Sequence, residues 1–203
     1  MADEIRAIEE EARHVLELVE RMQLTRLLKR LPPRLVWAAY VFINGFLTIA
    51  LLALLAVATR TPFVFPSLGP TAYLFFFTPL AVSASPRHAV LGHAVGLICG
   101  YGAYVVTGSH GFGGTELLSA WWPEALAAAL SLAATGALMV LLKVSHPPAG
   151  ATTLIVSLGI LARVEYLVVI EVAVILLTAQ AFLINRAAGL DYPVWEKRGA
   201  PVR

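Results

Sequence analysis

Long runs of apolar residues, separated by short polar or proline-containing stretches, dominate this chain. Four of the runs, 35–59, 89–107, 123–142 and 164–184, contain few or no charged residues. A helix of about 20 apolar residues crosses a hydrocarbon core of about 30 Å. The pattern therefore predicts an all-α polytopic membrane protein in which these runs are transmembrane helices.

Two further apolar segments differ from these runs because prolines interrupt them. They contain FPSLGPTAYL and SHPPAGATTL, and both carry the pattern Pro-x-x-Gly-x-Thr. Superposition places Pro66, Gly69 and Thr71 on Pro147, Gly150 and Thr152. Proline prevents a regular helix in the first part of each segment, and the remainder can be helical. We therefore interpret 61–79 and 144–161 as two copies of a discontinuous half-helix.

Lys and Arg positions bear on whether these broken segments cross the membrane or re-enter it. With re-entrant segments there are four crossings, and the loop 108–122, which has no Lys or Arg, becomes cytoplasmic. With six crossings, Arg87 and Lys143 join the basic ends of the chain in the cytoplasm, and Arg60 and Arg163 are the exceptions. The positive-inside rule favours six crossings. The halves 35–107 and 123–185 then form an inverted repeat of three spans each.

The two ends of the chain are polar, and we predict that both are cytoplasmic. Residues 1–31 have apolar positions three and four apart, an acidic start and a basic end, which together predict an amphipathic or coiled-coil helix. It would lie on the bilayer or on the protein, or mediate self-association. Residues 186–203 form a predicted tail. The expected location is the cell (inner or plasma) membrane.

Composition narrows the function classes. The chain is 59% apolar and 14% charged, outside the usual balance of soluble proteins. Its single cysteine excludes an intrachain disulfide and a thiolate metal cluster. No pattern indicates a metal site, a cofactor, a nucleic-acid partner or a nucleophilic triad, so we expect no enzyme activity.

The broken segments are the predicted binding site. A half-helix that begins inside the membrane exposes backbone N–H groups and the positive end of its dipole, which favours an anion. In an inverted repeat two such ends would face each other. The alternative, for one such motif alone, is that proline and glycine serve packing. The candidate substrate-binding residues are Pro66, Ser67, Gly69, Thr71, His146, Pro147, Pro148, Gly150, Thr152 and Thr153.

Two titratable residues are candidates for proton coupling. His146 could pair an anion or carry a proton, or could instead cap the broken helix. Glu171 lies deep in the last run, where an ionised carboxylate needs a partner such as His93 or His146, protonation, or a watery cavity. His88 and His110 are expected in solvent near the ends of runs. Asn44 and Gln180 are expected to hydrogen-bond between helices.

Small residues predict close helix packing and self-association. Gly92, Gly96 and Gly100 recur every four residues and would form one face of a helix. Six short crossings with many small residues also lead us to predict a homodimer in the lipid bilayer.

The two broken segments, together with PRHAVLGHAVG, closely resemble the HPP family of integral membrane proteins, whose namesake motif stands here as His146-Pro147-Pro148. The resemblance covers about 35–184 and leaves out the N-terminal helix. Members in plant plastids and cyanobacteria are associated with nitrite transport. The resemblance therefore implies a small monovalent anion, nitrite first, as the substrate.

Three function classes follow. The first is a transporter or channel-like permease for nitrite or a similar anion. The second is a non-transporting membrane scaffold that oligomerises or recruits partners through its N-terminal helix. The third, a membrane enzyme using His146 and Glu171, is the weakest because no nucleophile is paired with a base.

Overall fold

The computed structural model describes residues 23–109 and 122–196, and every regular element within them is helical. Four helices are long and apolar enough to cross a membrane: α3 (Pro33–Thr59), α5 (Pro86–Thr107), α6 (Trp122–Leu141) and α8 (Val164–Ala187). Between them lie the short helices α4 (Leu68–Phe77) and α7 (Ala149–Ser157), the turn η1 (Val82–Ala84) and, at the start, α2 (Leu24–Leu27). The all-α membrane class is confirmed, and each predicted span differs from its helix by at most three residues at an end.

Part of the predicted N-terminal helix lies outside the described residues, namely 1–22. In the described part of that segment, α2 covers only Leu24–Leu27 before the chain turns into α3. The end of the predicted tail, residues 197–203, and most of the loop predicted at 108–122 also lie outside the described residues.

Prolines and one glycine set several helix boundaries. Pro33 and Pro86 begin α3 and α5, where a helix needs no N–H donor. Pro66 precedes α4 and Pro148 is the N-cap of α7, so α7 begins only after its prolines. α4 begins earlier than predicted, at Leu68, because Pro70 falls in its first turn, where a helix tolerates proline. α5 ends at Gly108, whose φ of 69° is a left-handed conformation that glycine adopts without a Cβ clash.

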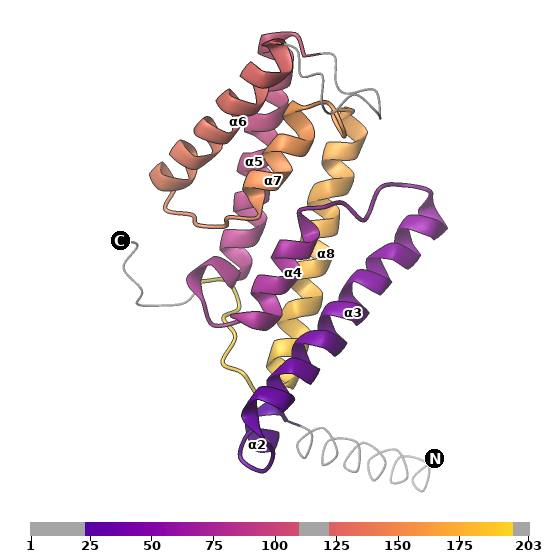
Figure 1. Cartoon of the computed structure of the whole chain (residues 1–203), viewed down its shortest axis with the longest axis vertical. Helices are drawn as coiled ribbons and strands as arrows, with labels where there is room; N and C mark the ends of the chain where they lie inside the picture. The colour runs from indigo at the N-terminus through magenta and orange to yellow at the C-terminus, as the bar shows by residue number, and fades with distance from the viewer. Residues whose placement is uncertain (1–22, 110–121, 197–203) are drawn as a thin grey trace, which may run out of the picture.

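The three helices α3, α4 and α5 run in senses opposite to those of α6, α7 and α8, taken in the same order (Figure 1). α3 rises, α4 descends and α5 rises, whereas α6 descends, α7 rises and α8 descends. α4 and α7 have 10 and 9 residues, so each is only about 15 Å long. Both begin in the middle of the molecule and run away from each other. Their N-terminal ends are therefore brought together.

Several segment ends gather on one side of the molecule. The Leu24 N–H donates to the Ala188 carbonyl (3.0 Å), which joins the segment before α3 to the end of α8. The Arg87 N–H, at the start of α5, donates to the Trp195 carbonyl (3.0 Å). The Arg87 guanidinium also donates to the Lys143 carbonyl, after α6, at 3.2 Å. Because α3 and α5 both begin on this side, the chain returns across the molecule between them.

The segment after α8 is held by a buried tyrosine as well as by Arg87. Tyr192 has 0% exposure and donates its hydroxyl hydrogen to the Ala84 carbonyl in η1. Burial raises the pKa of the Tyr192 phenol, so this hydroxyl stays a neutral donor. The Arg87 guanidinium also pairs with Glu196 at 2.9 Å. These contacts fix the tail against the starts of α5 and η1.

The glycine face predicted on α5 is confirmed as the surface that packs against α7. A Cβ added at Gly92 would lie 2.7 Å from the His146 Cβ, one at Gly96 would lie 2.8 Å from the Ala149 oxygen, and one at Gly100 would lie 2.7 Å from the Thr153 oxygen. Real Cβ atoms do not approach so closely. The three glycines therefore allow the backbone of α7 to lie directly on α5.

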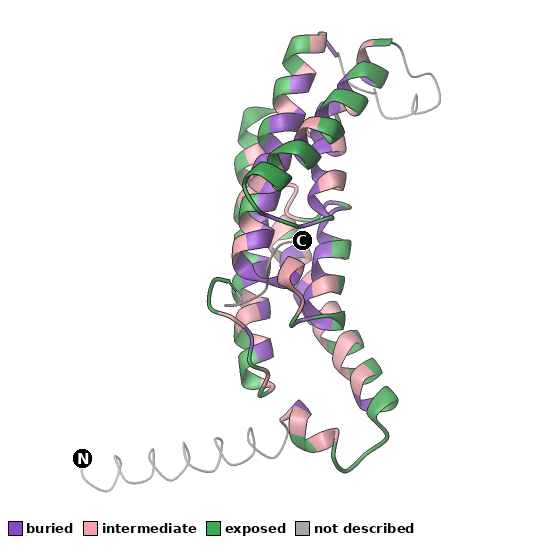
Figure 2. Cartoon of the chain, turned by 90° about the vertical axis from the view of Figure 1, so that its left-hand side faces the viewer, coloured by how far each residue is buried: buried purple, intermediate pink, exposed green. Residues whose placement is uncertain are grey.

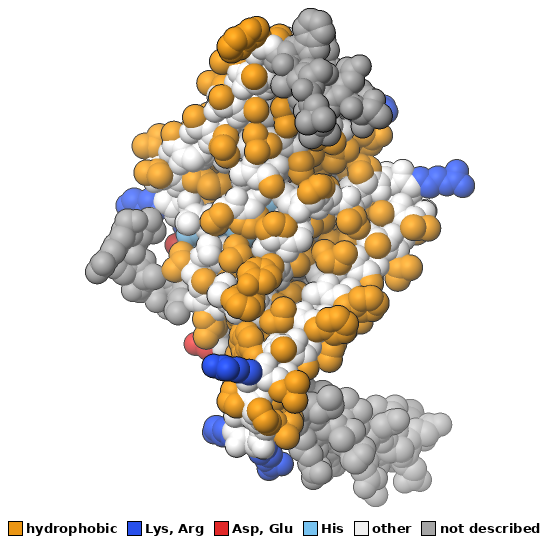
Figure 3. Space-filling view, in the orientation of Figure 1, with side chains coloured by type: hydrophobic (Ala, Val, Ile, Leu, Met, Phe, Trp, Pro, Cys, Tyr) orange, Lys and Arg blue, Asp and Glu red, His pale blue; other side chains and the backbone are white. Residues whose placement is uncertain are grey.

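The described surface is apolar to an extent that suits lipid rather than water. Phe42, Val57, Val106 and Val140 are each at least 75% exposed. Buried residues gather along the interior of the bundle (Figure 2), whereas hydrophobic side chains cover much of the face seen in Figure 3, with Lys and Arg at its edges and lower end. Exposed apolar area on this scale is typical of a membrane-facing surface.

Two of the predicted interhelical contacts are wrong. Asn44 donates to the Tyr40 carbonyl of its own helix (2.8 Å), and Gln180 Oε1 is buried without a hydrogen-bond partner in the described residues. Asn185 makes the interhelical bonds instead. Its Oδ1 accepts from the Tyr40 hydroxyl (2.7 Å), and its Nδ2 donates to the Phe75 carbonyl (3.1 Å). One amide thus joins α3, α4 and α8.

Candidate functional site

The first turns of α4 and α7 meet through their side chains. Ser67 is the N-cap residue of α4, and its Oγ lies 2.7 Å from Oγ1 of Thr152 in α7. Thr71, one turn further along α4, donates its hydroxyl hydrogen to the Ser67 carbonyl at 2.9 Å. The two Pro-x-x-Gly-x-Thr segments thus contribute their hydroxyls to one common point.

Two imidazoles complete this polar cluster. His93 of α5 lies between the two threonines, with Nδ1 2.7 Å from Thr152 Oγ1 and Nε2 2.9 Å from Thr71 Oγ1. His146 Nε2 lies 3.3 Å from the same Thr71 oxygen, and its Nδ1 lies 2.7 Å from the Ser83 carbonyl oxygen. The two ring centroids are 4.9 Å apart. We call Ser67, Thr71, His93, His146 and Thr152 the junction cluster.

The neutral junction cluster has a proton arrangement in which every side-chain hydrogen has an acceptor. The Ser83 carbonyl can only accept, so His146 carries its proton on Nδ1 and leaves Nε2 as an acceptor. Thr71 directs its hydroxyl hydrogen to the Ser67 carbonyl and therefore accepts from His93 Nε2–H.

The rest of the arrangement follows from this His93 tautomer. His93 Nδ1 accepts the Thr152 hydrogen, and Thr152 accepts the Ser67 hydrogen. Both hydroxyl hydrogens are thereby used inside the junction cluster.

The junction cluster is closed to solvent. All five side chains have 0% exposure. Five polar side chains gathered away from water lose free energy unless they are hydrogen-bonded to one another or to a ligand. The structure thus contains a hydrogen-bonded and occluded polar site within an apolar bundle.

The predicted site residues divide into two groups. Ser67, Thr71, His146 and Thr152 come together in the junction cluster, and Thr153 is buried beside it with its hydroxyl unpaired in the described residues. The others do not converge. Pro66, Gly69 and Pro147 are exposed, Gly150 is partly exposed, and Pro148 is the buried N-cap residue of α7.

The expectation of free backbone donors at the start of α7 is wrong. The N–H groups of Ala149, Gly150 and Ala151 donate to the carbonyls of His146, Pro147 and Pro148, each at 3.0 Å. The turn that carries the prolines supplies acceptors for the helix end. Side-chain hydroxyls and imidazoles, rather than bare N–H groups, are therefore the groups that this junction offers.

His88 is also placed differently from the prediction. The sequence predicts it in solvent, but its side chain has 0% exposure, and its Nδ1 accepts the Ser145 N–H at 2.8 Å. His88 thereby fixes the residue that precedes His146. Its Nε2 lies 3.6 Å from Glu196 of the tail. His110 lies outside the described residues.

Glu171 lies apart from the junction cluster. It is half-buried on α8, beside Leu97, Tyr101 and Leu167, and its Oε2 is buried without a hydrogen-bond partner in the described residues. No hydrogen bond or ion pair joins Glu171 to His93 or His146 in the part of the chain that the structure describes. The pairing considered from the sequence is therefore not present.

Sequence reasoning missed the central position of His93. The sequence suggests His93 only as a partner for Glu171, although it directly follows Gly92 within the glycine pattern of α5. A glycine face marks a helix surface that is covered closely by a neighbour. A histidine next to that face was the available signal.

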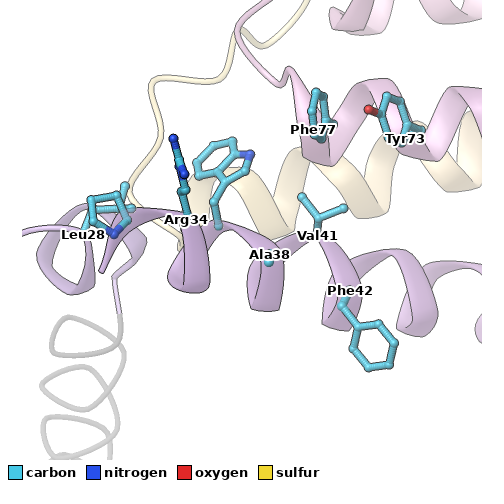
Figure 4. Close-up of a pocket in the computed structure, with 9 residues that line it drawn as sticks. Leu28, Arg34, Ala38, Val41, Phe42, Tyr73 and Phe77 are labelled. Atoms are coloured by element: carbon cyan, nitrogen blue, oxygen red, sulfur yellow. The ribbon is translucent and has the colours of Figure 1, made fainter. Parts of the chain in front are cut away.

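A separate groove lies on the outside of the bundle. Leu28, Arg34, Trp37 and Ala38 line it from the α2 and α3 side, and Tyr73 and Phe77 line it from α4 (Figure 4). Its lining is apolar apart from Arg34, the Tyr73 hydroxyl and the Trp37 indole N–H. None of the junction-cluster residues lines this groove, so it is a surface feature separate from the site.

Comparison with known proteins places the chain in a family. Neither the curated proteins nor the solved structures contain a match. The family model described as HPP, transmembrane region, matches residues 30–193, which include every helix from α3 to α8 and the whole junction cluster. This chain therefore belongs to the HPP transmembrane family.

Proposed function

We propose that this protein is a membrane permease for a small monovalent anion, and that nitrite is its substrate. The observation that carries the proposal is the junction cluster, in which hydroxyl and imidazole groups from three helices converge inside an apolar bundle. The choice of nitrite rests on the implied kinship with nitrite-associated HPP proteins.

The electrostatics of the junction favour an anion over a cation. The N-terminal ends of α4 and α7 meet there, and each helix end carries a positive partial charge of about half a unit when fully developed. The cluster itself contains no carboxylate. Hydroxyl O–H and imidazole N–H groups are suitable donors to an anion that has left water.

The same geometry supports six crossings in two inverted repeats. The chain returns between α3 and α5 through an extended arm and α4, and between α6 and α8 through α7 and its preceding turn. This places Arg87, Lys143 and the tail on one side, which we assign to the cytoplasm by the positive-inside rule. Discontinuous helices that meet near the midplane are a recurrent transporter design.

We further propose that the permease is a homodimer in the bilayer. The support is the large apolar outer face of α3, where Phe42, Phe46 and Leu54 are each at least 66% exposed. Crosslinking in native-like vesicles is the direct measurement. Only monomers across a range of protein-to-lipid ratios would contradict the dimer.

Nitrite flux into proteoliposomes tests the function. We expect Thr152→Val to lower the flux at least about tenfold, because its hydroxyl bonds both Ser67 and His93. Thr107→Val is the matched control, since the Thr107 hydroxyl donates only to the Ala103 carbonyl of its own helix (2.8 Å). Wild-type flux equal to that of protein-free liposomes would overturn the proposal.

Truncation separates a permease from a scaffold. A chain without residues 1–22 should keep most of its nitrite flux if transport resides in the junction cluster. A scaffold that acts through its N-terminal segment would show no flux in either form and would lose partner recruitment on truncation.

A further inference from the structure

We propose that the junction cluster takes up one proton together with each anion, on Nδ1 of His93, so that transport is electroneutral. This inference rests on the proposed permease function and deepens it. It assigns a role to His93, and it names the transported species as an anion plus a proton.

The first argument is that a proton on His93 Nδ1 would release the donors that an anion needs. In the neutral cluster, Ser67 donates to Thr152 and Thr152 donates to His93 Nδ1, at 2.7 Å in each case. With a proton on Nδ1, His93 instead donates to Thr152. Thr152 Oγ1 can then accept from both His93 and Ser67, so the Thr152 hydroxyl hydrogen has lost its acceptor and can turn to an anion, and the Ser67 hydroxyl can follow.

The second argument is charge balance. A buried imidazolium without a counter-ion is costly in an apolar bundle, and so is a buried anion without a counter-charge. Neither His93 nor His146 has a carboxylate partner in the described residues. The proton and the anion therefore stabilise each other, and each favours binding of the other by the same factor.

The surroundings of His93 contain few competing charges. The titratable group in contact with it is His146, 4.9 Å away between ring centroids. α7 and η1 have no ionisable side chain, and α4 has only the exposed Tyr73. The ionisable groups on its other neighbours are Arg87, His88, Cys99, Tyr101 and Tyr104 on α5 itself, Glu124 on α6, and Glu165, Tyr166, Glu171 and Arg186 on α8. His88 bonds Ser145, and Glu124 accepts from Ser109.

The balance of the cycle is simple. On one side of the membrane the neutral cluster binds one proton and one anion, and on the other side it releases both and returns to its neutral tautomers. His146 keeps its Nδ1–H on the Ser83 carbonyl throughout, and its Nε2 stays unprotonated beside Thr71. The only covalent bond that forms and breaks in the cycle is the Nδ1–H bond of His93. The hydroxyl groups exchange hydrogen-bond partners but keep their hydrogens.

The experiment measures nitrite and lumenal pH together in proteoliposomes whose membrane potential is clamped with K⁺ and valinomycin. We expect one proton to enter per nitrite above the protein-free background, at a rate that does not depend on the clamped potential. Nitrite flux that slows at an inside-negative potential, with no matching acidification, would overturn the inference while leaving the permease function standing. Absence of any protein-dependent flux would instead overturn the permease function.

Variants assign the proton to His93. His93→Gln should lower nitrite flux at least about tenfold, the size expected for losing a hydrogen bond to a charged group, and should abolish the dependence of the remaining flux on external pH. Thr152→Ser should restore coupling that Thr152→Val removes, because it keeps the hydroxyl.

Two control variants remove other titratable groups. His88→Gln replaces an equally buried histidine on the same helix and keeps an acceptor for the Ser145 N–H, so one proton per nitrite should remain. Glu171→Gln should likewise leave the ratio unchanged. Loss of proton coupling in Glu171→Gln, with coupling intact in His93→Gln, would overturn the assignment.

Discussion

The two Pro-x-x-Gly-x-Thr segments have the same spacing but different surroundings. In FPSLGPTAYL the residue before the first shared proline is Phe65, which is 4% exposed and belongs to the hydrophobic core. In SHPPAGATTL the equivalent residue is His146, which belongs to the junction cluster. One copy thus supplies apolar packing where the other supplies an imidazole, so the two segments share a sequence pattern but contribute differently to the junction cluster.

The two short helices are also anchored by different means. α7 lies directly on the glycine face of α5, with backbone contacts at Gly96 and Gly100. α4 is held at its C-terminal part by the amide of Asn185, which bonds the Phe75 carbonyl. Close backbone packing leaves little freedom, whereas a hydrogen-bonded tether permits some. We infer that α4 is the more adjustable partner in the junction.

The largest expected effect comes from filling the glycine face. Gly100→Val would place a Cβ 2.7 Å from the Thr153 carbonyl oxygen and 2.9 Å from the Val156 Cβ. Forcing α7 away from α5 should cost about 3 kcal/mol and open the junction cluster. Thermal unfolding of purified protein should show a large fall in Tm.

Gly102→Val is the matched control for that substitution. It lies two positions further along α5 and has no atom within 4 Å of its added Cβ. It should unfold close to the wild-type temperature. Equal destabilisation of both variants would show that helix propensity, and not contact with α7, decides the result.

A smaller effect is expected from removing the tether of α4. Asn185→Ala loses the bonds to Tyr40 and Phe75 and leaves the Phe75 carbonyl without that donor. We expect a loss of about 1–2 kcal/mol in unfolding free energy.

Combining Tyr40→Phe with Asn185→Ala measures the coupling free energy between these two side chains. Because the Tyr40 hydroxyl bonds the Asn185 side chain, the double variant should be less destabilised than the sum of the single variants. Additive losses would mean that the two side chains act independently, and that Asn185 does not link α3 to α4.

The smallest effect is expected at the two glycines of the repeat itself. A Cβ at Gly69 meets nothing within 4 Å, and one at Gly150 meets only the Leu132 Cδ1 at 3.4 Å. Alanine at either position should change stability by less than about 1 kcal/mol and leave nitrite flux near wild type. A strong loss of flux on substituting one of these glycines would instead support the sequence-based expectation that this glycine faces the ligand.

Much of the fold could be read from local pattern. Apolar runs of about 20 residues predicted the four long helices because a bilayer demands that length. Prolines predicted where α7 could not yet be helical, although α4 begins at Leu68 with Pro70 inside its first turn. The four-residue glycine period predicted a close-packing face on α5. Each of these properties depends on neighbours in the chain or along one helix.

The site was predicted only in part, since contacts between distant residues decided the rest. Hydroxyl and imidazole residues in the repeated segments were identifiable as polar interruptions of an apolar chain. The placement of His93 between Thr71 and Thr152, and the placement of Gly69 and Gly150 outside the cluster, depend on how the helices rotate against one another. A rotation of one helix exchanges its buried and exposed faces without changing its composition.

The chain's own order of residues was enough to establish membrane helices, two broken segments and a repeated motif, because hydrophobic length, proline and glycine act locally. Tertiary packing alone decided which polar side chains share hydrogen bonds. His93 and Thr152 are 59 positions apart in the chain, and they meet because the glycines of α5 let α7 approach closely enough for a 2.7 Å contact.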